Sequence, residues 1–296
     1  MSKGVKSILI ATLFFSAMNV IVKMLSHLPA VELALFRSVF TLATCYIIIR
    51  KLGLTVFGNK NRLLYLRGLF GTVSLIFFFK SVHYLPLATA TLVHYLTPFF
   101  TTFFGFLFLK EKFYRIQWLF LFICFAGILI TQHDKGIFNT FNIHNSGLLF
   151  GMGASVAAAG AYNCIRKISS SFNPNVIMIY FPLMAIPICA VTLAITGGFV
   201  MPTGFDWFLI LLMAILTQAA QYYLTVAYQN EKVGNIAVYS NLGIVYAVAN
   251  GIIFFKEIPS FNSWIGIFIV VSGIFLNLFS DKIFLIIRNL KNDLAK

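Results

Sequence analysis

Long apolar segments alternate along the chain with short clusters of charged and turn-forming residues. A helix needs about 20 apolar residues to cross the hydrocarbon core of a bilayer, and the clusters divide the chain into segments of about that length. The ten predicted membrane-spanning helices are residues 5–25, 31–50, 63–82, 86–109, 116–132, 146–167, 174–196, 207–228, 233–255 and 261–281. The connections between them are short, so no soluble domain is expected.

The composition agrees with this pattern. Of 296 residues, 60% are hydrophobic and 10% are charged, whereas a soluble domain carries about 25% charged residues. The sequence therefore predicts an all-α polytopic membrane protein that lies in the lipid bilayer. Its four cysteines fall in apolar segments and form no C-x-x-C pair, which indicates core packing and no disulfide or zinc site.

The positive charges are distributed by side of the membrane. With a cytoplasmic N-terminus, sixteen of the 22 lysines and arginines fall in cytoplasmic segments, as the positive-inside rule requires. They are Lys3, Lys6, Arg50, Lys51, Lys60, Arg62, Lys110, Lys112, Arg115, Arg166, Lys167, Lys232, Lys282, Arg288, Lys291 and Lys296. Both termini are therefore predicted to be cytoplasmic, in a plasma (inner) membrane, with residues 282–296 as a basic tail. This topology accounts for the net charge, so no nucleic-acid partner is expected.

The two halves of the chain are similar in sequence. A shift of 146 residues aligns residues 105–128 with residues 251–274, with identity at nine positions that include Lys110 with Lys256 and Glu111 with Glu257. Each half has five predicted spans, and an odd number places the second half upside down relative to the first. The sequence thus predicts two inverted five-helix repeats, at residues 1–132 and 146–281, an arrangement that favours alternating access.

Several segments resemble one group of transporters. The resemblance rests on FRSVF at 36–40, LRGLF at 66–70, LPLATATLVHYLTPFFTTFFGFLFLKEKF at 85–113, and the stretch from Trp118 to Gly127. Together they resemble the EamA group of the drug/metabolite transporter superfamily. This resemblance implies a ten-helix secondary transporter with cytoplasmic termini and a central cavity lined largely by spans one, three, four, six, eight and nine. Members move amino acids, nucleobases, S-adenosylmethionine and other small metabolites.

His94 is the leading candidate for a ligand of substrate or proton. It lies near the middle of the fourth span, where an ionisable residue costs several kcal/mol and usually faces a cavity or a partner. Pro98 has no N–H, so the carbonyl of residue 94 loses its helical donor and is open to a ligand or a neighbouring helix. The alternative is a neutral histidine that is hydrogen-bonded to another span. In the second half the matching residues are Ser240 and Ile244, so any role is asymmetric.

Cations exceed carboxylates within the predicted spans. The spans contain three cations, Lys23, Arg37 and Arg67, and one carboxylate, Glu32, near the start of the second span. Such an excess suits a substrate with a carboxylate or phosphate group. Arg67 is a candidate ligand, although it and Lys23 also lie close enough to the span ends to snorkel. For Arg37 we favour a structural role, by pairing with Glu32 or by capping helix carbonyls.

Uncharged polar residues at middle depth form a second candidate set for substrate binding. They are Asn19 in the first span, Tyr95 in the fourth, Tyr162 in the sixth, Gln218, Gln221 and Tyr222 in the eighth, and Ser240 and Asn241 in the ninth. Three of them, at i, i+3 and i+4 in the eighth span, share one helix face, which must look at protein or water. Either interhelical hydrogen bonds or a cavity lining explains the set.

Glu111 and Glu257 precede the fifth and tenth spans, where a carboxylate complements a positive helix start, and we expect a structural role for both.

No nucleotide-binding loop occurs in the sequence, so we expect that ATP does not drive transport. We expect no metal and no cofactor.

The leading hypothesis is a secondary transporter of a small polar or zwitterionic metabolite, such as an amino acid, a nucleobase or an S-adenosylmethionine-like compound. A proton or a counter-substrate is the expected coupling partner, and the oligomeric state stays open, a homodimer included. An intramembrane enzyme and a membrane scaffold are the alternatives. Neither gains anything from matched, inverted halves, and no catalytic residues pair within the spans.

Overall fold

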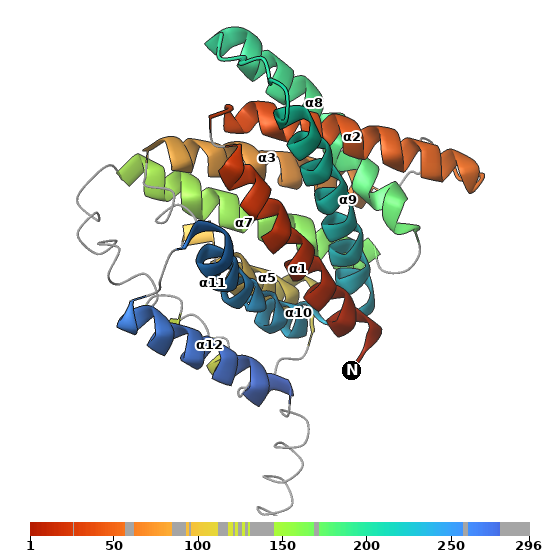
Figure 1. Cartoon of the computed structure of the whole chain (residues 1–296). Helices are drawn as coiled ribbons and strands as arrows, with labels where there is room; N and C mark the ends of the chain where they lie inside the picture. The colour runs from red at the N-terminus through yellow and green to blue at the C-terminus, as the bar shows by residue number, and fades with distance from the viewer. Residues whose placement is uncertain are drawn as a thin grey trace, which may run out of the picture.

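Every regular element in the described part of the chain is a helix. The computed structural model describes residues 1–25, 27–56, 62–84, 93–94, 96–111, 118–120, 122–123, 126–127, 130, 145–168, 172–256 and 260–278. The helices are α1 (Lys3–Met24), α2 (Ala30–Lys51), α3 (Arg62–Tyr84), α5 (Thr97–Leu109), α7 (Asn145–Ile168), α8 (Pro174–Thr196), α9 (Asp206–Asn230), α10 (Val233–Ser240), α11 (Leu242–Phe255) and α12 (Phe261–Leu278) (Figure 1). The prediction of an all-α protein is confirmed.

Within the described residues, five helices are long and apolar enough to cross a membrane. They are Lys3–Val22, Val31–Lys51, Gly147–Ile168, Pro174–Thr196 and Asp206–Asn230. Most of the fifth predicted span, the fourth span's residues before position 93, Tyr95, Glu257 and the basic tail at 282–296 lie outside the described residues.

Local sequence explains where α8 begins and ends. Asn173 caps its start, and its side chain accepts a hydrogen bond from the Asn175 backbone N–H at 3.0 Å. Pro174 follows at the first helical position, where no backbone donor is needed. Gly197 ends the helix in the left-handed conformation, with φ of 62°. These signals place both helix ends at the predicted residues.

The ninth predicted span is broken, which corrects the prediction of one continuous helix over 233–255. Asn241 separates α10 from α11, and its N–H donates to the Val238 carbonyl three residues back, at 3.2 Å. The fourth span has a similar local tightening, because the Leu96 N–H donates to the Val93 carbonyl at 3.1 Å just before α5 begins. Such tight turns replace the usual four-residue spacing of helical hydrogen bonds with a three-residue spacing.

Small residues bring α3 close to α7 and α8. A Cβ atom added at Gly153 of α7 would lie 2.7 Å from the Phe77 ring of α3. A Cβ at Gly68 of α3 would lie 2.5 Å from the Tyr180 carbonyl oxygen of α8. These contacts leave no room for a side chain, so the glycines set the spacing of the three helices.

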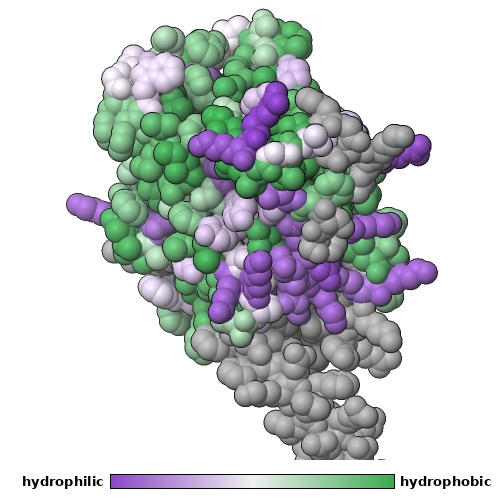
Figure 2. Space-filling model, turned by 90° about the vertical axis from the view of Figure 1, so that its right-hand side faces the viewer, coloured by the Kyte–Doolittle hydropathy of each residue, from purple (hydrophilic) through white to green (hydrophobic). Residues whose placement is uncertain are grey.

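The helices pack in matched pairs. The most extensive contacts join α3 to α7, α1 to α9 and α2 to α8, and α12 packs against α10 and α11 at the edge of the bundle (Figure 1). Large apolar side chains remain exposed on the outside, among them Ile195, Phe261 and Phe268. Figure 2 shows hydrophilic residues gathered on the side where α1 begins, among hydrophobic ones. An apolar outer surface of this kind suits contact with lipid.

Candidate substrate site

Arg67 and Arg37 share one aromatic contact in the helix bundle. The guanidinium carbons of Arg67 on α3 and Arg37 on α2 are each 5.6 Å from the centre of the Phe181 ring on α8. Arg67 is only 4% exposed, and its Nε atom has no hydrogen-bond partner. The glycine at position 71 makes this possible, because a Cβ there would lie 2.5 Å from Arg67 Nη1. The second arginine is half-buried.

The expected pairing of Arg37 with Glu32 is wrong. Glu32 is fully buried near the start of α2, and its Oε2 atom accepts a hydrogen bond from the Val200 backbone N–H at 3.0 Å. Its other carboxylate oxygen has no partner. The carboxylate therefore holds the loop between α8 and α9, whereas Arg37 packs on Phe181.

The polar face of α9 meets α2 and α3. Arg67 Nη2 donates to Gln221 Oε1 at 3.4 Å, and Gln218 Nε2 donates to Cys45 Sγ at 3.3 Å. The Gln218 Oε1 atom is buried without a partner. Tyr222 is 37% exposed, and its ring lies beside Tyr223 at 5.6 Å. Two of the three predicted residues thus point into the bundle, whereas the tyrosine does not.

His94 lies next to α3, and its carbonyl has a donor within its own segment. The Thr97 hydroxyl donates to the His94 carbonyl at 2.6 Å and so replaces the donor that Pro98 removes. The carbonyl therefore does not depend on a ligand or a neighbouring helix for a hydrogen bond. The imidazole ring lies 5.0 Å from the Phe78 ring, and its Nδ1 atom is buried without a hydrogen-bond partner. The polar atom of His94 that lacks a partner is thus Nδ1 of its side chain.

Replacing Thr97 with valine is expected to destabilise the fold by about 1–3 kcal/mol, because the His94 carbonyl would then be buried without a donor. Thr217→Val is the matched control. The Thr217 hydroxyl also donates to a carbonyl, that of Met213 at 2.8 Å, but this acceptor keeps its helical N–H donor. Thermal unfolding of the purified variants measures the difference. Equal unfolding temperatures would contradict the assignment.

One aromatic ring and one amide of α7 face α9 and α5. The Tyr162 ring stacks on Tyr228 with centres 4.8 Å apart. Asn163 Nδ2 donates to the Thr101 carbonyl at 3.0 Å, and the Asn163 Oδ1 atom is buried without a partner. Tyr162 thus lies in the bundle interior as predicted for a site residue.

The candidates on α10 and α1 differ in burial. Ser240 donates within its own helix to the Ala237 carbonyl at 2.8 Å, which meets its polar demand locally. Asn241 is 2% exposed at the break between α10 and α11, and its Oδ1 atom has no partner. Asn19 is exposed on α1, so the structure does not place it in the interior. Tyr95 lies outside the described residues.

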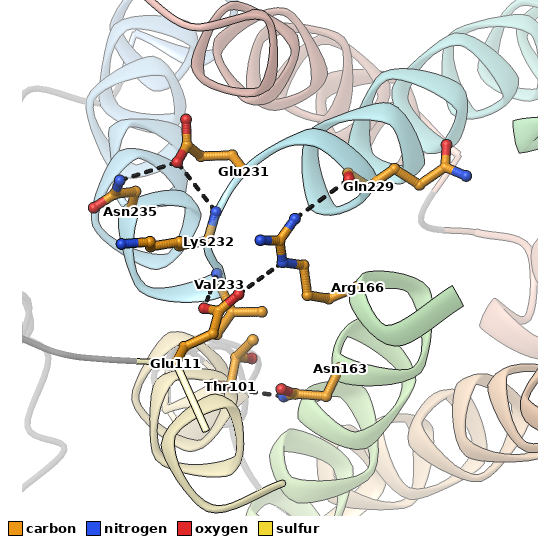
Figure 3. A network of polar contacts seen from close by, with 9 residues as sticks. All are labelled: Thr101, Glu111, Asn163, Arg166, Gln229, Glu231, Lys232, Val233 and Asn235. Carbon is orange, nitrogen blue, oxygen red and sulfur yellow. Dashed lines mark hydrogen bonds and ion pairs between the residues drawn. The ribbon is translucent and has the colours of Figure 1, made fainter. Parts of the chain in front are cut away.

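A network of polar contacts joins four helices at the end of the bundle where α5 and α7 end (Figure 3). Arg166 Nε donates to Glu111 Oε1 at 2.7 Å, and Arg166 Nη1 donates to the Gln229 carbonyl at 3.3 Å. Glu111 Oε2 accepts a hydrogen bond from the Val233 backbone N–H at 3.0 Å, at the start of α10. Glu111 therefore complements the start of α10, from the other half of the chain. The predicted start of the fifth span, at residue 116, lies outside the described residues.

Arg166 is a functional candidate that the sequence pattern did not reveal. In the sequence, Arg166 is one of many cations that follow the positive-inside rule. Its position in the last turn of α7, and not in a loop, is the signal that could have distinguished it. Its side chain is a quarter exposed and that of Glu111 a tenth. A partly buried ion pair with two further hydrogen bonds is stronger than a surface pair.

Buried polar atoms without partners are spread over several helices. Among the described residues they include Glu32 Oε1, Arg67 Nε, His94 Nδ1, Asn163 Oδ1, Gln218 Oε1 and Asn241 Oδ1. Buried polar groups normally find a partner in the protein or in water, so each of these atoms is a candidate for contact with water or a ligand. In the described part of the chain, no three His, Cys, Asp or Glu residues cluster as metal ligands would.

The comparisons with known proteins decide the family. The model of the EamA-like transporter family matches residues 2–132 and 145–279. The chain belongs to this EamA-like transporter family. It is therefore a transporter and not an enzyme, as the sequence predicted.

Relatives of this EamA-like transporter include transporters from bacteria and animals. It is 30% identical over 285 residues to the pseudopaline exporter CntI of Pseudomonas aeruginosa, with 94% of this chain and 96% of the relative covered. It is 28% identical to solute carrier family 35 member G1 of Mus musculus, with 85% and 71% covered. A solved crystal structure shares the fold, with a TM-score of 0.82 and 18% identity over 97% of this chain and 98% of that one.

Proposed function

We propose that this transporter has ten membrane-spanning helices in two inverted repeats, at residues 1–132 and 146–281, with both termini and the tail at 282–296 in the cytoplasm. The family model matches the chain twice, over nearly these same ranges. Lys110 and Lys256, which correspond across the two halves, also share an unusual backbone conformation, with φ of 52° and 54°. Both lysines follow the end of a helix.

The packing of the helices also supports the repeat. If the halves correspond, α3 is equivalent to α9, α7 to α1, and α8 to α2. The contact of α3 with α7 then matches that of α9 with α1, and the contact of α3 with α8 matches that of α9 with α2. All four contacts are present, and α2 packs on α8, its own equivalent. Exchange of equivalent contacts is what an inverted repeat needs to open alternately to each side.

The proposed activity is secondary transport of a small polar or zwitterionic metabolite across an inner membrane by alternating access. The observation that carries this proposal is the contact between Arg67 and Gln221, which joins polar side chains of the two halves inside the bundle. A substrate held between the halves experiences both sides of the membrane when the halves move relative to each other. The family relatives named as exporters and transporters favour this activity over a scaffold role.

The proposed substrate-binding residues are those predicted from the sequence, and we favour the ones that lie inside the bundle. Arg67, Gln218, Gln221, His94, Tyr162 and Asn241 are buried or half-buried there. We propose that the remaining residues of the set bind substrate in other conformations of the transporter. They are Ser240, Asn19, Tyr222 and Tyr95. His94 is the proposed site for a coupling proton, and a counter-substrate is the alternative driving partner.

Efflux from proteoliposomes loaded with many compounds at once tests the proposed function. Liposomes that contain the protein are loaded with a small-molecule extract of bacterial cytoplasm, and mass spectrometry follows the compounds that appear outside. At least one compound is expected to leave down its gradient without ATP, and to stay inside protein-free liposomes. If every compound leaves protein-containing and protein-free liposomes equally, the transport proposal fails. In the same assay, an unchanged pH dependence in His94→Gln would exclude the proton role.

A further inference from the structure

Two positive charges lie close together inside the bundle without a counter-charge among the described residues. Arg37 and Arg67 both contact Phe181, at 5.6 Å from each guanidinium carbon to the ring centre. The ion pairs found within the described part of the chain involve neither arginine. The single polar contact of the Arg67 guanidinium there is the bond to Gln221 at 3.4 Å, the long end of the hydrogen-bond range.

The contact with Phe181 compensates only part of the cost of burying these charges. Burying a charge costs several kcal/mol, whereas a cation–π contact contributes about 0.5–2 kcal/mol. The two guanidinium groups are also near enough to each other for their charges to repel. An anionic group placed between them would remove the repulsion and supply the missing hydrogen bonds.

The fold itself does not require positive charge at these positions. With the shift of 146 residues, Arg37 corresponds to Leu183 and Arg67 to Met213. Met213 is 1% exposed and belongs to an apolar cluster that includes Ile21. The second half therefore packs the equivalent helix positions with apolar side chains. Since one half folds without these charges, packing alone does not explain them in the other half.

We infer that the substrate carries a carboxylate or phosphate group and that Arg37 and Arg67 bind it. A guanidinium presents two parallel N–H donors that match the two oxygens of such a group, and two guanidiniums suit one oxyanion. Gln221 lies within reach, and its amide nitrogen is a further donor. Phe181 covers the two charges in this conformation. Its ring moves aside when the anion binds between the two guanidinium groups. The inference rests on the proposed transport function and narrows its substrate class.

Ligand titrations of purified protein test this inference. Succinate, inorganic phosphate and the neutral analogue succinamide are each added at constant ionic strength, and the unfolding temperature is followed. Succinate or phosphate is expected to raise it by about 2 °C or more near saturation, because a ligand that binds only the folded state stabilises it. Succinamide is expected to cause no rise. A larger shift with succinate than with phosphate identifies a carboxylate site, and the reverse identifies a phosphate site.

The matched control uses the residues of the second half. The double variant Arg37→Leu, Arg67→Met is expected to fold with an unfolding temperature no lower than that of the wild type, and to lose the response to both anions. Arg67→Lys keeps the positive charge but loses the two parallel N–H donors of the guanidinium. The apparent affinity of this variant for the anion is therefore expected to fall about tenfold. An equal response to succinamide, an unchanged response in the double variant, or no response of the wild type to either anion would overturn the inference. Efflux of compounds without an acidic group would refute the inference while the transport proposal stands.

Discussion

Replacing Arg166 with glutamine is expected to open the end of the bundle where α5 and α7 end, which is the proposed cytoplasmic end. The change removes the ion pair with Glu111 and the bond to the Gln229 carbonyl, which together join α5, α7 and α9 (Figure 3). A partly buried, charged hydrogen-bond pair contributes about 1–2 kcal/mol after allowance for solvent. Loss of that energy shifts a two-state equilibrium by about 5–30-fold toward the open state.

Cysteine labelling measures this shift. Thr101 is fully buried near the network, so Thr101→Cys reports on opening in a background whose native cysteines are replaced by alanine. The rate of labelling by a membrane-impermeant maleimide is expected to rise about 5–30-fold in Arg166→Gln. Lys167→Gln is the control, because this neighbour is exposed and carries the same charge. If both variants label at the same rate, the network does not hold this end closed.

The sequence of the first half has no counterpart of Arg166. The residue at the corresponding position is Val20, and Glu257, which corresponds to Glu111, lies outside the described residues. A pair at one end alone stabilises the closed form of that end and leaves the other end without the same restraint. Because of this asymmetry, replacing Arg166 is expected to shift the balance between the two conformations in one direction.

Replacing Gly68 with alanine is expected to lower the stability by about 1–3 kcal/mol and the unfolding temperature by several degrees. The added Cβ would lie 2.5 Å from the Tyr180 carbonyl oxygen and 3.0 Å from its carbonyl carbon. These are backbone atoms of α8, so no side chain can rotate away, and the two helices must separate. The separation also moves Arg67 relative to Phe181, since each is the neighbour of a clashing residue.

The control for this prediction is Gly243→Ala, because a Cβ at that position meets nothing within 4 Å. Its unfolding temperature is expected to equal or slightly exceed that of the wild type. Tryptophan fluorescence during heating in detergent measures both variants. Equal unfolding temperatures would show that α3 and α8 are not held at the spacing described.

The helix ends could be predicted from the sequence because their signals are local. The start of α8 at Pro174 and its end before Gly197 depend on a cap, a proline and a glycine that are close to those ends in the chain. The break at Asn241 could not, since no proline marks it, and its tight turn depends on packing of α10 and α11 against other helices. The site residues on α9 could be predicted from their spacing, because two glutamines on one helix face cannot both point to lipid.

The contacts between side chains could not be predicted from the sequence. Arg37 and Glu32 are close together in the same helix and opposite in charge, yet each finds its contact on or beside α8, at Phe181 and Val200. Pro98 removes a donor from the His94 carbonyl, and the hydroxyl of the residue before it supplies another. Such outcomes depend on the distances between helices, which the glycines of α3 and α7 set in three dimensions.

The sequence by itself determined that this chain is a helical membrane protein of the EamA-like transporter family, because hydrophobic length, charge placement and family motifs are properties of the chain order. The tertiary structure alone decided that Arg37 and Arg67 meet at Phe181 without a counter-charge among the described residues, and that Arg166 and Glu111 join helices of both halves. The physical reason is that the free energy of a buried charge depends on what surrounds it in space, and those neighbours come from distant parts of the chain.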